Sequence, residues 1–129
     1  MKENILFVCK YNRFRSKVAE AYFNKINKNR NITAKSLGII KGNPISKDAK
    51  IAAKKYGLNI GGEPKTLSSK LLSKTNRIII VADDVPKEIF KYKDRYLQKI
   101  LVWKIKDDIK SISKIISKVN EFNRRFAKK

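Results

Sequence analysis

The stretch that most restricts the fold of this chain is the run Arg77–Ala82, which contains four β-branched residues in succession. A strand with one face in water alternates apolar and polar side chains, but this run is apolar from its second residue to its last. Uninterrupted apolar strands are typical of a parallel sheet that helices cover on both faces. The run therefore predicts an α/β protein with its sheet in the centre.

The rest of the chain alternates strand-like and helix-like segments. Besides residues 77–82, strands are predicted at residues 5–8, 32–37 and 99–105. Helical patterns are predicted after Ser16, from about Ser46 to Gly57, in a short segment within residues 64–72, from residues 83–86 onward, and over residues 109–126. Four strands that alternate with helices predict an open, four-stranded parallel sheet between two helical layers, in one domain that spans residues 1–129.

A cysteine directly follows the first strand and is the candidate catalytic group. The segment reads Cys9-Lys10-Tyr11-Asn12-Arg13-Phe14-Arg15-Ser16 and then becomes helical. A strand, a short loop and a helix form a typical anion site, because the loop amides and the unpaired N–H groups of the first helical turn converge at the positive end of the helix dipole. An electropositive site of this kind favours the thiolate form of cysteine. The segment therefore predicts a sulfur nucleophile within a phosphate-binding loop.

Two residues at the end of this loop are suited to assist the cysteine. Arg15 can offer two parallel N–H donors to phosphate oxygens, and the Ser16 hydroxyl can donate a hydrogen bond to the sulfur. The chain contains no histidine, which excludes hydrolases that depend on a Cys–His pair and any acid based on histidine. The alternative interpretation of Cys9 is a small buried apolar residue, the usual state of a lone cysteine after a strand.

The order of strand, Cys-x5-Arg-Ser and amphipathic helix resembles the low-molecular-weight protein tyrosine phosphatases, and Ser36-Leu37-Gly38 resembles the Ser-Ala-Gly that follows their second strand. The resemblance implies a flavodoxin-like phosphatase fold and metal-independent hydrolysis of phosphomonoesters through a phosphocysteine, without a cofactor. It also implies that Asn12 holds the loop in a left-handed backbone conformation, which asparagine tolerates. The loop residues expected to bind the substrate are Lys10, Tyr11, Asn12, Arg13, Phe14 and Ser16.

The departing oxygen of a phosphomonoester needs a proton, and a carboxylic acid is expected to supply it. In the resembled family the acid is the aspartate of an Asp-Pro pair just after the fourth strand. This chain has Asp107-Asp108 there, so Asp107 takes the position of the acid, and Asp108 replaces the proline and remains an alternative acid. Either aspartate could instead cap the last helix. Asp83 and Asp84 are expected at the same sheet edge, as caps or as acceptors that stabilise their loop.

Two loop positions depart from the resembled family. Tyr11 stands where glycine is common, and Phe14 stands where a second cysteine is often found. Without that second cysteine, an oxidised Cys9 has no neighbour with which to form a disulfide. The walls of the site are expected to come from Tyr11, Ile40 and Lys41.

The net charge of +21 raises the question of nucleic-acid binding. The lysines are spread through every predicted element, which favours a solvated basic surface and attraction for acidic substrates over a dedicated nucleic-acid site. The expected substrate is a phosphotyrosine protein or a small phosphomonoester, with inorganic phosphate as product.

Two other functions stay open from the sequence. One is arsenate reduction with an external thiol, because a single cysteine cannot form an internal disulfide; the other is a basic phosphate- or nucleic-acid-binding protein with an inactive loop. One cysteine also offers no Cys-rich metal site and is usual in a reducing compartment. Together with the lack of a segment long enough to cross a bilayer, it predicts a cytoplasmic protein without a membrane partner.

Overall fold

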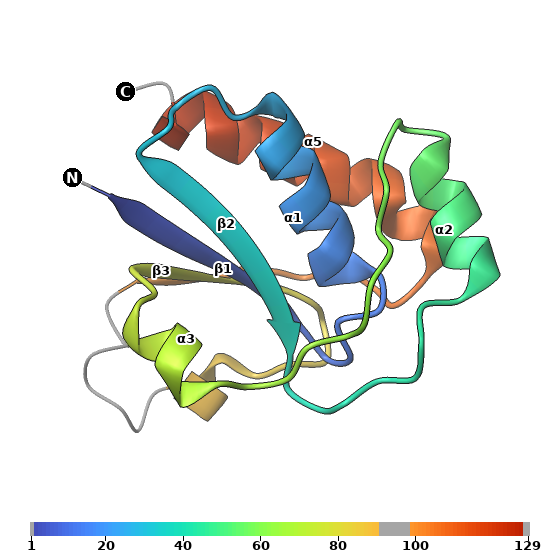
Figure 1. Cartoon of the computed structure of the whole chain (residues 1–129), viewed down its shortest axis with the longest axis horizontal. Helices are drawn as coiled ribbons and strands as arrows, with labels where there is room; N and C mark the ends of the chain where they lie inside the picture. The colour runs from blue at the N-terminus through green and yellow to red at the C-terminus, as the bar shows by residue number, and fades with distance from the viewer. Residues whose placement is uncertain (1, 91–98, 128–129) are drawn as a thin grey trace.

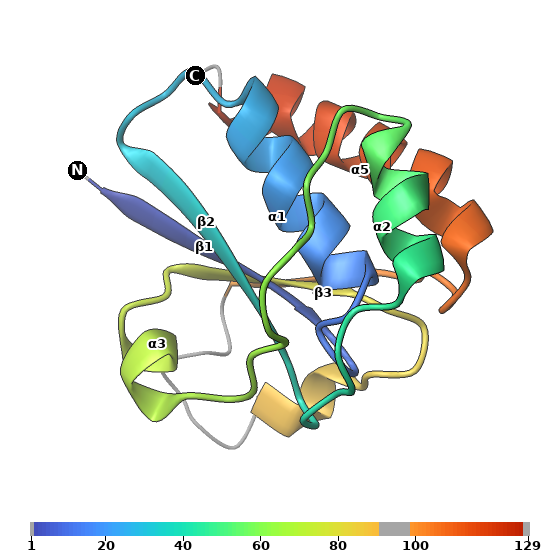
Figure 2. The same ribbon diagram turned by 45° about the vertical axis from the view of Figure 1, so that its right-hand side comes forward.

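The computed structural model describes residues 2–90 and 99–127 (Figures 1 and 2). The strands are β1 (Glu3–Cys9), β2 (Ile32–Gly38), β3 (Arg77–Val81) and β4 (Ile100–Trp103). The α-helices are α1 (Arg15–Ile26), α2 (Lys47–Lys54), α3 (Ser69–Ser73) and α5 (Ile112–Phe122). Shorter helical segments are η1 (Lys87–Phe90), η2 (Ile109–Ser111) and the π-helical η3 (Asn123–Ala127). The four strands pair in parallel in the order β2-β1-β3-β4, which confirms the predicted α/β fold with a four-stranded parallel sheet.

Helices lie on both faces of this sheet. Figure 1 shows α1, α2 and α5 on one face and α3 with η1 on the other, and the turned view in Figure 2 agrees. The central strand β1 is buried on both sides: Ile5 and Phe7 pack into the core under α1 and α5, whereas Leu6 and Val8 pack into a second core under α3. This arrangement explains why the central strands are apolar without alternation.

An aromatic cluster attaches α1 and α5 to the sheet. The ring of Phe7 on β1 lies 6.1 Å from Phe23 on α1 and 5.9 Å from Trp103 on β4, measured between centroids. Phe122 on α5 closes the cluster, at 6.0 Å from Phe23 and 6.1 Å from Trp103. Tilted aromatic pairs at these distances add to the free energy of burial. The cluster therefore fixes α1 against the strand that carries Cys9.

Two predicted helix boundaries differ from the structure. The last helix begins as η2 and becomes α-helical only at Ile112, because Asp108 accepts a hydrogen bond from the Lys110 backbone N–H and caps the shorter segment. Residues 83–86 do not form a first helical turn; η1 begins after Pro86. Residues 91–98, into which a helix from this point would continue, lie outside the described residues.

The carboxyl ends of the parallel strands bring Cys9, Asp83 and Asp107 to one edge of the sheet, as expected for a fold of this class. In the part of the chain that the structure describes, no helix combines the length and the apolar character needed to cross a membrane.

Candidate active site

Cys9 is the last residue of β1, and pairing with β2 fixes its position. It lies opposite Gly38 in the parallel register, and its carbonyl oxygen accepts a hydrogen bond from the Ile39 N–H at 3.2 Å. Helix α1 begins six residues later, after Phe14, and no side chain caps its first turn. An uncapped N-terminus beside a cysteine presents backbone donors and the positive end of the helix dipole to an anion.

The loop between Cys9 and α1 packs closely against the end of β2. A Cβ atom placed at Gly38 would lie 2.7 Å from the backbone nitrogen of Asn12 and 2.7 Å from the carbonyl carbon of Tyr11. Side-chain atoms do not approach backbone this closely, so the loop can occupy its position only because residue 38 is glycine.

The sulfur of Cys9 lies against two hydrogen-bonding groups. The Ser16 hydroxyl oxygen is 3.0 Å from Sγ, and the backbone N–H of Asn12 donates to Sγ at 3.3 Å. Asn12 has a φ of 55°, the predicted left-handed conformation, which turns its N–H back toward the sulfur. Both groups are placed to donate hydrogen bonds to negative charge on the sulfur during a reaction.

A buried hydrogen-bond network holds the Ser16 hydroxyl beside the sulfur. The Asn12 side-chain amide donates from Nδ2 to Ser16 Oγ at 2.8 Å and to Ser36 Oγ at 3.0 Å. Both amide hydrogens are then used, and Ser16 Oγ acts as an acceptor. The Ser16 hydroxyl keeps its own hydrogen, and it donates this hydrogen to Cys9 when the sulfur is a thiolate, since a thiolate has no proton to give. At the far end, Ser36 donates to Glu20 Oε1 at 2.5 Å.

Arg15 lies almost entirely in the interior, with 1% of its side chain exposed. Its Nη1 donates to the carbonyl oxygen of Ile105 at 2.9 Å and lies 3.0 Å from Asp84 Oδ1 and 3.6 Å from Asp83 Oδ1. Its Nε lies 3.7 Å from Asp107 Oδ1. Carboxylates on two loops therefore hold one guanidinium at the sheet edge, which compensates for the burial of its charge.

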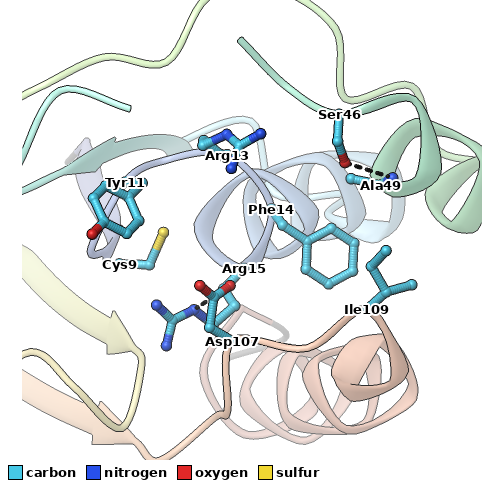
Figure 3. A pocket seen from close by; sticks show the side chains of 9 residues that line it. All are labelled: Cys9, Tyr11, Arg13, Phe14, Arg15, Ser46, Ala49, Asp107 and Ile109. Atoms are coloured by element: carbon cyan, nitrogen blue, oxygen red, sulfur yellow. Dashed lines mark hydrogen bonds and ion pairs between the residues drawn. The ribbon is translucent and has the colours of Figure 1, made fainter. Parts of the chain in front are cut away.

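A cavity of about 110 Å³ opens between the loop and the segment that follows β4. Cys9, Arg15 and Asp107 all line this cavity, and Figure 3 shows the Asp107 carboxylate beside the Arg15 side chain. The residues that line the cavity are Cys9, Tyr11, Arg13, Phe14, Arg15, Ser46, Ala49, Asp107 and Ile109. The cavity is thus small, with charged groups beside the sulfur and largely apolar groups around it.

Most of the predicted site residues either line this cavity or lie directly behind the loop that forms it. Six of them line the cavity: Cys9, Tyr11, Arg13, Phe14, Arg15 and Asp107. Asn12 and Ser16 are fully buried behind the loop and contact the sulfur from inside the protein. Lys10 does not line the cavity; its ammonium lies 5.3 Å from the centroid of the Tyr11 ring.

The structure decides three expectations about the surroundings of the cavity. Asp108 caps η2 and is absent from the cavity lining, whereas Asp107 lines it. Ile40 and Lys41, expected as walls, do not line the cavity, and Ile40 is 47% exposed. Asp83 and Asp84 bind Arg15, a contact that no sequence spacing indicated.

Sequence reasoning also missed several residues that build the site. Ser46, Ala49 and Ile109 reach the cavity from α2 and η2, and their positions depend on tertiary packing alone. Glu20 did leave a signal: it lies four residues after Ser16 on α1, and side chains at this spacing share a helix face. In the sequence, Ser36 was noted only as the first residue of Ser36-Leu37-Gly38, which resembles the Ser-Ala-Gly after the second strand of the resembled family.

The fold and the loop define a class of protein: a three-layer α/β domain in which the loop after the first strand holds a cysteine and an arginine at an anion-binding helix N-terminus. Residues 4–114 match the family model of the low molecular weight phosphotyrosine protein phosphatases, and the chain belongs to this family. Membership supports a phosphatase, and thus a hydrolase, function.

Solved structures share this fold at low sequence identity. The low molecular weight protein tyrosine phosphatase from T. tengcongensis has a TM-score of 0.83 and 22% identity over 97% of this chain and 100% of its own. The YwlE arginine phosphatase from Geobacillus stearothermophilus has a TM-score of 0.78 and 19% identity over 98% and 91%. The arsenate reductase from Archaeoglobus fulgidus has a TM-score of 0.70 and 23% identity over 92% and 97%.

These neighbours have different reactions, and the likeness to them concerns the fold. Comparison of the sequence with curated proteins gives no match.

Proposed function

We propose that the chain is a protein tyrosine phosphatase that hydrolyses phosphomonoesters through a phosphocysteine at Cys9. The observation that carries this proposal is the placement of the Cys9 sulfur, which accepts hydrogen bonds from Ser16 and Asn12 at the wall of a cavity that Arg15 and Asp107 share. A nucleophile, a cation for the phosphate oxygens and a carboxyl group are the three groups that the reaction requires.

In the first step, the Cys9 thiolate attacks phosphorus. A sulfur–phosphorus bond forms, the bond from phosphorus to the substrate oxygen breaks, and the Asp107 carboxyl gives its proton to the departing oxygen. The loop N–H groups and the Arg15 guanidinium stabilise the charge on the other three phosphate oxygens. Tyrosine is a poor leaving group as a phenolate, since its ordinary pKa is about 10, which makes the proton from the acid important.

In the second step, water attacks the phosphocysteine while Asp107 accepts a proton from it. The sulfur–phosphorus bond breaks, inorganic phosphate forms and the thiolate returns. The Ser16 hydroxyl, which the Asn12 network holds beside the sulfur, stabilises the thiolate as it leaves. The mechanism uses no metal ion.

Asp107 fits the role of the acid better than Asp108 does. Asp107 lines the cavity, and its side chain is 56% exposed, so it can exchange protons with water. Asp108 is occupied as the cap of η2, where its carboxylate accepts the Lys110 N–H.

The cavity walls favour an aromatic phosphomonoester. Tyr11, Phe14 and Ile109 supply flat or aliphatic surface to the cavity wall, which suits a phenyl ring. A phosphoarginine substrate would need a carboxylate to pair with its guanidinium group, and Asp107 is the sole carboxylate among the lining residues described. The proposed reaction needs Asp107 for proton transfer, so this carboxylate is not available to pair with the guanidinium group of a phosphoarginine substrate.

Kinetics on matched peptides tests the proposal. One peptide would carry phosphotyrosine, phosphoserine or phosphoarginine at the same position, and kcat/KM would be measured with a chelator present. We expect phosphotyrosine to be the best substrate, Cys9→Ser to abolish turnover, and acid quenching to trap phosphate on Cys9 of the wild-type protein. Preference for phosphoarginine would overturn the assignment of substrate, and turnover by Cys9→Ser would overturn the nucleophile.

The same assay separates the two other candidate functions. Arsenate reduction that depends on an added small thiol, without phosphopeptide hydrolysis, would indicate a reductase that uses Cys9 and an external partner. Nucleic-acid binding with a strong salt dependence and no hydrolysis would indicate a binding protein.

A further inference from the structure

A second cavity lies on the opposite side of the Asn12 network from the sulfur. Its volume is about 260 Å³, and it shares no lining residue with the cavity at Cys9. The lining residues that matter here are Lys17, Glu20, Ser36, Gly61 and Lys65, and we call this space the rear cavity. A water molecule occupies about 30 Å³ of liquid, so the rear cavity has room for a small ion with several waters.

Lys17 is the unusual residue of the rear cavity. It lies in the first turn of α1 and is only 9% exposed, although a lysine is rarely buried without a partner. Its ammonium has three N–H donors, and within the described residues it makes one hydrogen bond, to the Gly61 carbonyl oxygen at 3.4 Å. Burial lowers the pKa of Lys17, the charge of Lys65 lowers it further, and Glu20 opposes both. The site therefore holds a cation whose charge is poorly compensated.

The side chains that line the rear cavity carry more positive than negative charge. Two ammonium groups, of Lys17 and Lys65, face the single carboxylate of Glu20. One oxygen of that carboxylate already accepts the Ser36 hydroxyl at 2.5 Å. A negatively charged ligand placed between the two lysines would supply acceptors for their donors and balance the charge.

We propose that the rear cavity binds a small free oxyanion of the size of inorganic phosphate, held between Lys17 and Lys65. The polar contacts available to it are the two ammonium groups together with the Asn24 and Asn59 side chains, which also line the space. The proposal does not depend on the phosphatase function, because the two lysines that would hold the anion take no part in the proposed reaction.

The rear cavity is connected to the loop that holds Cys9. The Lys65 backbone N–H donates to Asn12 Oδ1 at 2.8 Å, and the Lys65 carbonyl oxygen accepts the Gly38 N–H at 2.7 Å. An anion on the Lys65 side chain therefore acts on the same residue that fixes Asn12. We expect bound anion to hold residues 61–65 in place against the loop at Cys9.

An NMR titration tests the proposal without using catalysis. The amide signals of Gly61 and Gly62 report on the rear cavity, and those of Tyr11 and Arg13 report on the loop at Cys9. Inorganic phosphate would be added at constant ionic strength. We expect saturable shifts at Gly61 and Gly62 with a dissociation constant that differs from the constant measured at Tyr11 and Arg13.

Two variants and a control decide the outcome. Lys17→Met and Lys65→Met should each weaken the binding measured at Gly61 by about tenfold or more, since each removes a charged hydrogen-bond donor. Lys65 is exposed, so that variant tests the site even if Lys17→Met folds poorly. Lys25→Met removes an exposed lysine from the same helix and should leave the binding unchanged.

Three results would overturn the proposal. In the first, the signals of Gly61 and Gly62 do not shift when phosphate is added. In the second, these signals and those of Tyr11 and Arg13 give the same dissociation constant in the wild-type protein and in both lysine variants. In the third, Lys25→Met weakens binding as much as Lys65→Met does. The second result would show that the shifts spread from phosphate bound at Cys9, and the third that the effect is one of overall charge.

Discussion

The Ser16 hydroxyl oxygen and the Cys9 sulfur lie 3.0 Å apart, and the Asn12 side-chain amide donates to the same hydroxyl oxygen at 2.8 Å. Ser16 accepts from Asn12 and keeps its own hydrogen, which it donates to the thiolate in the proposed reaction. A hydroxyl held in this position stabilises charge on the sulfur throughout the proposed reaction.

Removal of this donor should slow catalysis. A hydrogen bond to a charged group contributes about 1.5–3 kcal/mol, so Ser16→Ala should lower kcat by roughly 10- to 150-fold. Ser117→Ala, at an exposed position on α5, serves as the control. Equal rates for Ser16→Ala and wild type would remove Ser16 from this role.

Ser36 should matter for stability. Ser36→Ala leaves one hydrogen of the buried Asn12 amide without its acceptor, which costs about 1–3 kcal/mol. We expect the free energy of unfolding in urea to fall by this amount. Ser73, whose hydroxyl donates to the Lys70 carbonyl oxygen in an exposed position, gives the matched control Ser73→Ala. A loss no larger than that of the control would contradict the network.

Substitution of Asp107 and of Asp108 should affect hydrolysis differently, and the difference should depend on the leaving group of the substrate. Asp107→Asn should slow hydrolysis of phenyl phosphate by about 10²–10⁴-fold, with a much smaller effect on p-nitrophenyl phosphate, whose leaving group needs no proton. Asp108→Asn keeps a good helix cap and should retain activity on both esters. The assignment of the acid reverses if Asp108→Asn shows the dependence on leaving group and Asp107→Asn does not.

The buried ammonium group of Lys17 should make the free energy of unfolding depend on pH. Burial lowers its pKa in the folded protein below the ordinary value of 10.5, so the unfolded chain holds this proton more tightly. The cost of the buried charge is complete below the folded pKa and disappears as pH rises toward 10.5. In phosphate-free buffer, Lys17→Met should therefore exceed wild type in stability at pH 7.

Urea unfolding at several pH values measures this effect. The advantage of Lys17→Met should shrink as pH rises toward 10.5, whereas the difference between Lys25→Met and wild type should not follow this course. A Lys17→Met advantage that stays constant across the range would show that burial does not affect the protonation of Lys17.

Oxidation of Cys9 should be hard to reverse. It is the single cysteine of the chain, and Phe14 lines the cavity beside it. A sulfenic acid without a neighbouring thiol proceeds to sulfinic and sulfonic acids, which thiols do not reduce. After prolonged excess peroxide, we expect dithiothreitol to restore little activity and mass spectrometry to find the higher oxides on Cys9. Full recovery would contradict this prediction.

The sequence predicted the parts of the fold that depend on local pattern. The apolar run before Asp83 and the strand before Cys9 indicated a doubly covered parallel sheet, and all four strands form. The spacing from Cys9 to Arg15 and Ser16 indicated the loop, because these residues act within one short segment. The left-handed Asn12 was predicted for the same reason.

Contacts between distant segments could not be predicted in the same way. The pairing of Arg15 with Asp84 joins residues 69 positions apart, and it depends on how the loops after β3 and β4 pack at the sheet edge. The capping role of Asp108 was one of two open interpretations, and local geometry at η2 decided it. Ile40, expected as a wall, is 47% exposed and does not line the cavity, although its backbone N–H donates to the Lys10 carbonyl oxygen in the loop.

The missing side chain at Gly38 limits how this protein can diverge. Since a Cβ atom there would lie 2.7 Å from the Asn12 nitrogen, any other amino acid at this position pushes the neighbouring loop away. A displaced loop no longer directs its amides at one point. Descendants of this chain can therefore drift widely among their surface lysines, whereas position 38 has to remain glycine for as long as the loop keeps this path.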